Sequence, residues 1–445
     1  MDYLDFAQET VSSAMRAGAH EAEVFMQTGS EFSVDIRMGD IETLTQASYK
    51  GLGLRVFVGN RVAFASTTDF HPDVVEEMAS DTVELAQVAS EDAANGLPAV
   101  GPGPLPHIDL VDPNIQHLPA EDKIDMARDA ERAAFDFDTR ITNSHGAGFG
   151  SHTSARIIAN SNGILYSNAT TECGISCTPI AEQGPEKQVG SYWTAKRFLK
   201  DLESPMFVGE EAALRAVRKL GARKVQTQKV PVIFDWNVGS MLWGSVFSAL
   251  EGEAVHRGMS FLKDMIGKKI ASDLVTLTDD PLRPWGLGSM PFDGEGVLTK
   301  RKTVVDKGVL NLYFYDARTA RKYGQEPTGN ARRSYGSIPS VGPANFYLEP
   351  SAISVDNLVG EVSEGFYVMD TMGRGINIVT GDFSVGASGM WISGGEFAFP
   401  VQEVTIAGNM LDMLHNIDAV ANDIKFISSV VTPTFRISEM TVSGR

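Results

Sequence analysis

Glu253 and His256 form a pair that could hold a metal ion. They stand three apart in a predicted helix, so both side chains would share one face and could touch one ion. A single Glu-x-x-His supplies two ligands, and the sequence contains no second copy. The alternative is an exposed intrahelical contact near a helix C-terminus, where histidine is favoured. We expect that contact rather than a metal site.

Serine nucleophiles are a second possible source of chemistry. Ser245 and Ser248 lie on the same predicted helix, but no G-x-S-x-G elbow surrounds them. Ser384, in GDFSVG, stands in a glycine-rich turn that could present its hydroxyl. No base and orienting acid can be identified for it. We therefore interpret these glycines as residues that supply backbone angles for turns.

The isolated histidines and the two cysteines are expected to be structural. His145 and His152 flank GAGFGS, and we expect them to be surface groups or satisfied core groups. Cys173 and Cys177 fall in a predicted strand, on one face but about 13 Å apart. A disulfide needs the two Cα atoms within about 7 Å. We expect free thiols that act as small hydrophobic groups in a reducing cytoplasm.

Hydrophobic periodicity predicts a mixed first half of helices and strands. Turn signals at Gly59-Asn60 and Asn162-Gly163 suit hairpins, and Gly221 suits a helix C-cap. The predicted helices are 3–17, 72–85, 120–135 and 209–220, and the predicted strands are 23–27, 32–37, 52–58, 156–160 and 164–168.

The second half is rich in glycine and in short strands. It opens with a strand at 230–234 and a long helix from about Asn237 to His256. Hairpin turns are predicted at Asp306-Lys307-Gly308 and at Gly394-Gly395, the latter before Phe397, Phe399 and Val401 on one face.

The predicted fold class is therefore α+β, with a mixed α/β N-terminal half and a C-terminal half of largely antiparallel sheet opened by a long helix. We expect four segments along the chain. These are an α+β unit at 1–92, a Pro/Gly connector at 93–119, a second α+β unit at 120–225 and a β-rich domain at 226–445.

Composition limits the classes of partner. The 445 residues favour two or three domains, and a net charge of -19 opposes binding to nucleic acid or to an anionic membrane. Arg321, Lys322, Arg332 and Arg333 form the best basic cluster, which we interpret as a solvated loop surface. We predict neither a signal peptide nor a membrane-spanning segment, and expect a cytoplasmic protein.

Several sequence blocks resemble one protein family. TGDFSVGASGMW followed by PVQEVTIAGN is similar to the C-terminal signature of the TldD/PmbA family, on the PmbA (TldE) side. Three further blocks resemble the family in the expected order: Gly51 to Asp69, Pro291 to Leu310 and Ala320 to Arg333. The resemblance thus covers most of the chain.

The resemblance also marks where a zinc site is lost. In the catalytic subunit of this family, a His-Glu-x-x-x-His helix precedes a Leu-Glu-Gly segment, which matches Leu250-Glu251-Gly252 here. The motif positions then fall on Trp243, Gly244 and Ser248. Zinc requires imidazole, thiolate or carboxylate ligands, which none of these residues supplies. We expect no catalytic residue and no metal ligand in this chain.

The resemblance implies a non-catalytic subunit of a TldD/TldE-like zinc metallopeptidase that acts on unfolded or small peptides. A TldD-like partner would supply zinc, and the resulting heterodimer would share a cavity. Gly381, Asp382 and Ser384 are candidates for binding substrate there, and the segment from Gly373 to Gly381 could offer its backbone to an extended peptide. The resemblance also carries the older description of a modulator of DNA gyrase.

Two alternatives remain open. One is a homodimeric peptide-binding or scaffold protein without peptidase activity. The other is an independent hydrolase that uses Ser384 or the Glu253/His256 pair.

Overall fold

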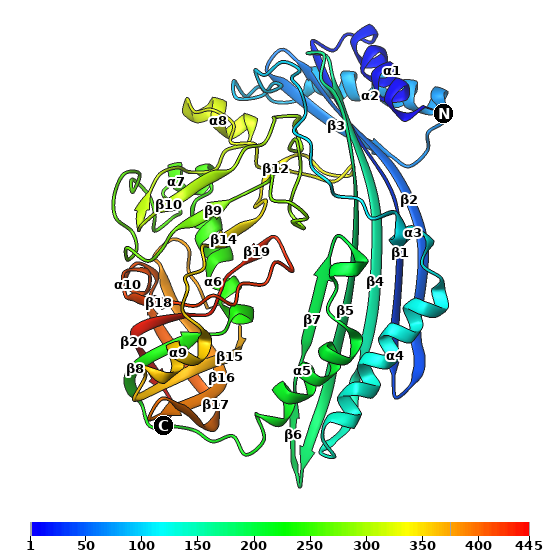
Figure 1. The fold of residues 1–445 in the computed structure, drawn as a ribbon. Coiled ribbons are helices and arrows are strands. Elements are labelled where there is room, and N and C mark those ends of the chain that lie inside the picture. Colours follow the sequence, from blue (N-terminus) through cyan, green and yellow to red (C-terminus); the bar gives the residue numbers. More distant parts are fainter. Residues whose placement is uncertain (1, 374, 445) are drawn as a thin grey trace.

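The computed structural model describes residues 2–373 and 375–444 and has an α+β architecture, as predicted (Figure 1). A long sheet with helices forms the N-terminal half, and the C-terminal half is β-rich. No helix among the described residues has both the length and the apolar character needed to cross a membrane.

Seven antiparallel strands build the long sheet, in the order β3-β2-β1-β4-β5-β6 with β7 also on β5. The predicted short strands are parts of much longer ones of 17 to 20 residues, β1, β2, β4 and β5. The sheet therefore joins segments from both predicted α+β units. The elements of this half are α1 (Tyr3–Arg16), β1 (Glu21–Arg37), β2 (Asp40–Val58), β3 (Arg61–Thr67), α2 (Pro72–Val88), α3 (Pro113–His117), α4 (Ala120–Phe137), β4 (Ile141–Asn160), β5 (Leu165–Gln183), β6 (Glu186–Val189), β7 (Tyr192–Lys196), the 3-10 helix η1 (Leu199–Asp201) and α5 (Pro205–Val217).

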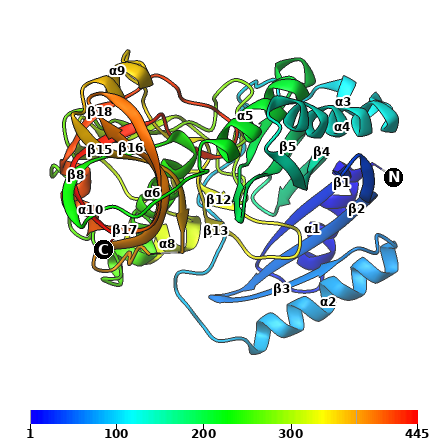
Figure 2. The same ribbon diagram turned by 90° about the horizontal axis from the view of Figure 1, so that it is seen from below.

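Alternation along β1 explains why helices cover one face of the sheet. Residues two apart in a strand share a face. Val24 packs in the core under α1 and α2, while Val34 packs in the core under α4 and α5. Phe25 points to the other face, where it belongs to a buried cluster that includes Phe292 of the C-terminal half. Figure 2 shows α1 and α2 on the outer side of the sheet, away from the C-terminal half.

Buried charges join the two halves where they meet. An Nη2 atom of Arg55 lies 3.0 Å from Glu23 Oε1 and 3.0 Å from Glu295 Oε1, and Arg333 also pairs with Glu23. None of these four side chains is more than 8% exposed. Glu295 in addition accepts a hydrogen bond of 2.7 Å from the backbone N–H of Ala317. This set, Glu23, Arg55, Glu295 and Arg333, is called the junction network below.

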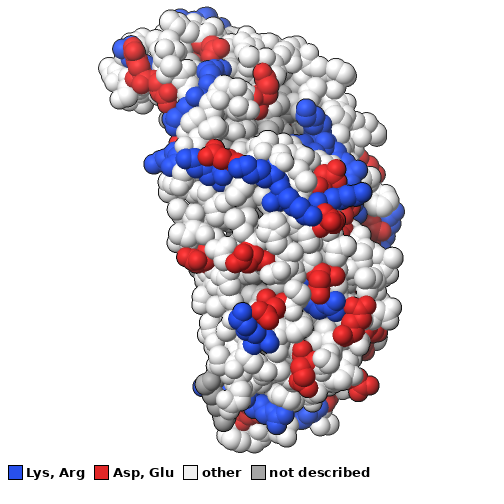
Figure 3. Space-filling view, turned by 90° about the vertical axis from the view of Figure 1, so that its left-hand side faces the viewer, with Lys and Arg blue, Asp and Glu red and all other residues white. Residues whose placement is uncertain are grey.

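The prediction that the basic cluster is a solvated loop surface is wrong for two of its four residues. The Arg333 side chain is buried in the junction network, and Arg332 Nη2 donates to the carbonyls of Gly288 and Pro343. Exposed Lys322 instead pairs with Glu253 at 3.0 Å. On the face seen in Figure 3, a band of Lys and Arg crosses the upper part with Asp and Glu beside it.

Three sheets form the C-terminal half, largely antiparallel as predicted, and the smallest of them is the pair β12–β13. Strands β8, β15, β16, β17 and β20 close into a ring, in which the β8–β15 pair is parallel. A second sheet has the order β11-β10-β9-β14-β19. The elements are β8 (Gln228–Phe234), α6 (Trp236–Ala249), α7 (Gly252–His256), β9 (Leu277–Asp279), β10 (Lys302–Asp306), β11 (Val309–Leu310), α8 (Ala317–Tyr323), β12 (Ala331–Arg332), β13 (Ser340–Val341), β14 (Phe346–Leu348), α9 (Val355–Gly360), β15 (Glu364–Met372), β16 (Asp382–Ser393), β17 (Glu396–Asn409), α10 (Met410–His415), β18 (Ile417–Val420), β19 (Val430–Val431) and β20 (Phe435–Ser443).

The long helix predicted from about Asn237 to His256 is two helices. α6 ends at Ala249, and Glu251 forms an isolated bridge with Phe314 before α7 begins. The N–H of Gly252 donates to the Phe314 carbonyl at 2.8 Å. A Cβ at Gly252 would lie 2.1 Å from the Tyr315 ring, so the close approach requires glycine. Pairing with a distant segment therefore interrupts the helix.

Candidate functional site

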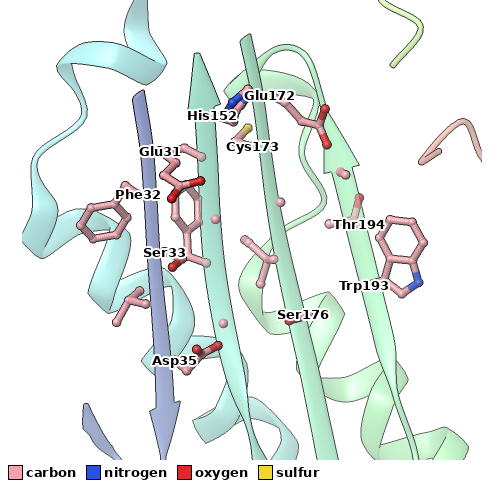
Figure 4. A pocket seen from close by; sticks show the side chains of 18 of the residues that line it. Glu31, Phe32, Ser33, Asp35, His152, Glu172, Cys173, Ser176, Trp193 and Thr194 are labelled. Carbon is pink, nitrogen blue, oxygen red and sulfur yellow. The ribbon is translucent and has the colours of Figure 1, made fainter. Parts of the chain in front are cut away.

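The largest cavity described here, about 650 Å³, lies on the face of the long sheet that the helices leave uncovered. We call this surface the open sheet face. β1, β4, β5 and β7 contribute most of its residues (Figure 4), and Thr45 comes from β2. The side chains that point onto it include Glu31, Ser33 and Asp35 of β1, His152 of β4, Glu172 and Ser176 of β5 and Trp193 of β7.

Strand register arranges these side chains in rows across the sheet. Directly paired residues of antiparallel strands point to the same face. Glu31 pairs with His152, which pairs with Glu172, so one row carries two carboxylates and an imidazole.

The neighbouring row carries almost no side-chain atoms. Ser33 pairs with Gly150, which pairs with Gly174. A Cβ on Gly174 would lie 2.8 Å from the Thr194 carbonyl oxygen, whereas a Cβ on Gly150 meets nothing nearer than 4.0 Å. The glycines therefore make a low floor between walls of larger side chains.

Hydrogen bonds hold two of the polar side chains of this face, those of His152 and Asp35. His152 Nε2 lies 2.9 Å from the Tyr49 hydroxyl, and the two rings stack with centroids 5.8 Å apart. Thr43 donates to Asp35 Oδ2 at 2.5 Å. Glu31 is exposed, and no hydrogen bond to its side chain occurs within the described part of the chain. An acidic, half-open floor of this kind can hold a ligand with cationic or hydrogen-bond-donating groups.

The three residues that the family resemblance places at the zinc-motif positions lie on α6, and their side chains do not fit zinc. Trp243 is fully buried, and its Nε1 donates to Thr432 Oγ1 at 3.0 Å. Gly244 and Ser248 are half-buried on another side of the helix. An indole N–H, a glycine and a hydroxyl do not make a zinc ligand set.

Glu253 and His256 lie on α7 in a cluster of aromatic and charged groups. The Glu253 carboxylate accepts hydrogen bonds from Lys322 at 3.0 Å and from the Tyr323 hydroxyl at 2.9 Å. Partial burial opposes ionisation, but these hydrogen bonds lower the pKa of Glu253. The His256 ring stacks on Tyr323 and its Nε2 lies 3.0 Å from the Tyr315 hydroxyl. Within residues 2–373 and 375–444, no group of three or more His, Cys, Asp or Glu side chains is arranged to hold a metal ion.

The predicted substrate-binding residues lie elsewhere in the fold. Gly381 is a turn residue with φ 79°, and Asp382 and Ser384 are exposed at the start of β16 in the C-terminal half. Asp382 accepts a hydrogen bond of 2.6 Å from Thr380, and the Ser384 N–H donates to the Gly375 carbonyl. The segment from 373 to 381 is largely loop, and residue 374 lies outside the described part. These residues are not brought together with the open sheet face.

The remaining sequence candidates are also separate. Ser245 donates to the Met241 carbonyl at 3.1 Å on α6. His145 is exposed in β4, next to a register shift between Ser144 and Ala147. Sequence reasoning missed the open sheet face, although Glu31, Ser33 and Asp35 alternate in a way that places them on one face.

Both cysteines are free and buried, as predicted. They face the helices, and Cys177 Sγ lies 3.7 Å from the Ala130 carbonyl oxygen. Burial raises the pKa of each thiol to about 12. Since the thiolate is the reactive form, we expect neither to react with iodoacetamide at pH 8 in the native protein. Mass spectrometry after native labelling checks this, with urea-unfolded protein as the control, in which both must react.

Comparison with known proteins relates most of the chain to one protein family. Family models described as PmbA/TldA metallopeptidase domain 1, central domain and C-terminal domain match residues 22–86, 113–220 and 227–444. A relative from Escherichia coli O157:H7, named metalloprotease PmbA, is 34% identical over 98% of this chain and 96% of its own length.

Solved structures agree with this assignment. One from Bacteroides thetaiotaomicron, named as a candidate modulator of DNA gyrase, is 30% identical with a TM-score of 0.93 and full coverage of both chains. TldE from Thermococcus kodakarensis is 21% identical with a TM-score of 0.92, over 99% of this chain and 100% of that one. The second likeness bears on the fold alone.

Proposed function

Because the chain belongs to the PmbA/TldD metallopeptidase family, we propose that it is the non-catalytic subunit of a two-subunit zinc peptidase. In this proposal a TldD-like chain supplies the zinc and the catalytic groups. This chain contributes part of the cavity in which an unfolded or small peptide is held.

The chemistry of α6 carries the proposal. Zinc in a peptidase is held by imidazole or carboxylate groups, and the aligned positions here hold Trp243, Gly244 and Ser248. The Trp243 indole fills the core between α6 and Phe435, with ring centroids 5.6 Å apart. Trp243 therefore packs in the core. Replacing it with a smaller, metal-binding side chain would leave a cavity there.

The open sheet face is the surface that we propose for peptide. Its central strands β1, β4 and β5 already have neighbours on both sides, so a peptide cannot join the sheet there as another strand. It would instead lie across the glycine floor at Gly150 and Gly174, held by side chains such as Glu31 and Trp193. Gly381, Asp382 and Ser384 stay a separate prediction for substrate contact.

The location of the protein is part of the proposal. Free, buried cysteines suit a reducing compartment, so we place the protein in the cytoplasm.

Reconstitution tests the proposal. The purified chain alone is expected to carry no stoichiometric zinc and to leave a casein-like unfolded substrate uncut. Mixed with the TldD-like chain of the same organism, it should form a stable complex that cleaves the substrate. Zinc-dependent cleavage by the isolated chain would contradict the proposal. Failure of any TldD-like chain to bind it would favour the homodimeric binding protein instead.

A further inference from the structure

Three arginines meet where the C-terminal half begins to cover the long sheet. They are Arg156 of β4, Arg197 directly after β7 and Arg332 of β12. One short segment of the C-terminal half, 286–290, lies against all three. Its contacts are, in order along the segment, Gly286 O with Arg197 Nε at 3.3 Å, Gly288 O with Arg332 Nη2 at 3.0 Å and Met290 Sδ with Arg156 Nη1 at 4.0 Å. We call these three residues the arginine cluster.

The arginine cluster has little countercharge of its own. Within residues 2–373 and 375–444, its only ion pair joins Arg197 Nη1 to Glu172 Oε2 at 3.9 Å. The Nε atoms of Arg156 and Arg332 are buried and donate to no described group, and the same holds for Nδ2 of Asn168, which pairs directly with Arg156 on the same face. Burial and the like charges of Arg332 and Arg197 lower the pKa of Arg156 to about 9. Buried donors without acceptors cost free energy, so an anion that accepts from them would be stabilised.

Two carboxylates of the C-terminal half act on the cluster from a distance but are bound by other groups. Asp279 pairs with Lys302 at 3.2 Å. Asp293 accepts hydrogen bonds from three backbone N–H groups, those of Glu295, Val297 and Ala331. In the described part of the chain, neither carboxylate forms an ion pair with an arginine of the cluster. The cluster therefore keeps guanidinium donors free for a ligand.

The arginine cluster lies at one end of the open sheet face. Arg156 shares this face with His152, four residues away along β4, which corresponds to about 13 Å. Ser154, a small half-buried side chain, is the one residue of β4 between them on that face. His152 and Glu172 line the end of the cavity that is nearest to the cluster (Figure 4). An extended peptide in the cavity thus reaches the cluster with about four further residues.

We propose that the arginine cluster binds a carboxylate of a peptide that lies on the open sheet face, so that the carboxylate end of the peptide points toward the C-terminal half. The cavity floor carries Glu31 and Asp35, which suit cationic groups, and the cluster carries the opposite charge. Guanidinium groups match the geometry of a carboxylate. The two ends of the face therefore select one orientation of the peptide. The inference rests on the proposed function in taking a peptide as the ligand of this face.

Peptide binding by the full chain without a partner subunit tests the inference. Three N-acetylated hexapeptides of glycine and alanine serve as probes. One has a free C-terminal carboxylate, one has a C-terminal amide, and one is an amide whose last residue is glutamate. At constant ionic strength, we expect calorimetry to give a dissociation constant for the free acid at least about tenfold below that of the neutral amide. The third peptide distinguishes the source of the carboxylate, because tight binding assigns the site to an acidic side chain as well, and weak binding assigns it to the free C-terminus alone.

Variants of the cluster connect this preference to its residues. In Arg156→Gln and in Arg332→Gln, the ratio between the neutral amide and the free acid should fall to about one. Arg132→Gln is the matched control, since it removes an exposed positive charge from α4, on the helix-covered side of the sheet, and should leave the ratio unchanged. Arg156→Gln should not lower the Tm, because it removes a charge that no described carboxylate pairs with.

Equal binding of the free acid and the neutral amide by the wild-type chain would overturn the inference, and so would binding of neither. A preference for the free acid that survives in both cluster variants would also overturn it. Each of these results leaves the reconstitution test of the peptidase function standing. Failure of that reconstitution, in turn, would not change the binding ratio measured on the chain alone.

Discussion

The Glu23→Ala variant is expected to lose about 3 to 5 kcal/mol of stability, because it leaves the buried guanidinium of Arg333 without its carboxylate. Arg55 would keep Glu295, but Arg333 makes its ion pair with Glu23. Uncompensated buried charge is among the most destabilising changes a single substitution can cause. Urea unfolding followed by circular dichroism measures the loss.

Two further variants separate charge from volume. Glu23→Gln keeps the side-chain volume and removes the charge. We expect its loss of stability to be most of that of Glu23→Ala. Glu31→Ala is the matched control. Glu31 lies eight residues further along β1 on the same face, but it is exposed, and its loss should cost about 0.5 kcal/mol or less. Equal effects at Glu23 and Glu31 would show that the junction network does not contribute to stability.

The contrast between these two glutamates follows from the length of β1. At one end of β1, the C-terminal half covers the face that the helices leave free, and there Glu23 pairs with Arg55 and Arg333. The other end is uncovered and carries Glu31 at the cavity. The junction network thus lies where the C-terminal half covers the sheet, and the cavity lies on the part of the same face that stays uncovered.

Local patterns predicted the short-range structure well. The helix predicted at 3–17 is α1, and the two-residue turns at Gly59-Asn60 and Gly394-Gly395 connect strands as expected. Each of these features depends on residues close in sequence. The strands predicted at 23–27 and 32–37 are a single strand, because Gly29 and Ser30 break the apolar alternation without breaking the pairing. The Tyr49 ring lies across Gly29, where a Cβ would come within 2.6 Å of its hydroxyl.

Long-range pairing set the features that the sequence could not predict. The row of Glu31, His152 and Glu172 joins three strands, with 120 residues between the first two. Nothing local to His152 indicates that a carboxylate lies on each side of it. The end of α6 depends likewise on Phe314, which is more than 60 residues away. A resemblance in sequence blocks identified the family, but the register of distant strands determines where the cavity lies.

Replacing Gly150 with isoleucine is expected to block the open sheet face while leaving the fold intact. The added Cβ meets nothing nearer than the Phe32 carbonyl oxygen at 4.0 Å, and the backbone is not in the left-handed region. The new side chain would therefore rise from the floor into the cavity, between Ser33 and Gly174. A β-branched residue in a strand also stabilises by up to about 1 kcal/mol relative to glycine.

In the reconstituted complex with a TldD-like chain, Gly150→Ile should lower peptide cleavage about 100-fold, because a displaced peptide no longer reaches the catalytic groups in a reactive geometry. The zinc content of the partner and the mass of the complex should not change. Gly101→Ile is the matched control. A Cβ at this connector residue meets nothing within 4 Å, and Gly101 does not line the cavity on the open sheet face. Unchanged cleavage by Gly150→Ile would exclude the open sheet face as the peptide surface. The segment from Gly381 to Ser384 would then be the next surface to test, by Ser384→Ile in the same complex.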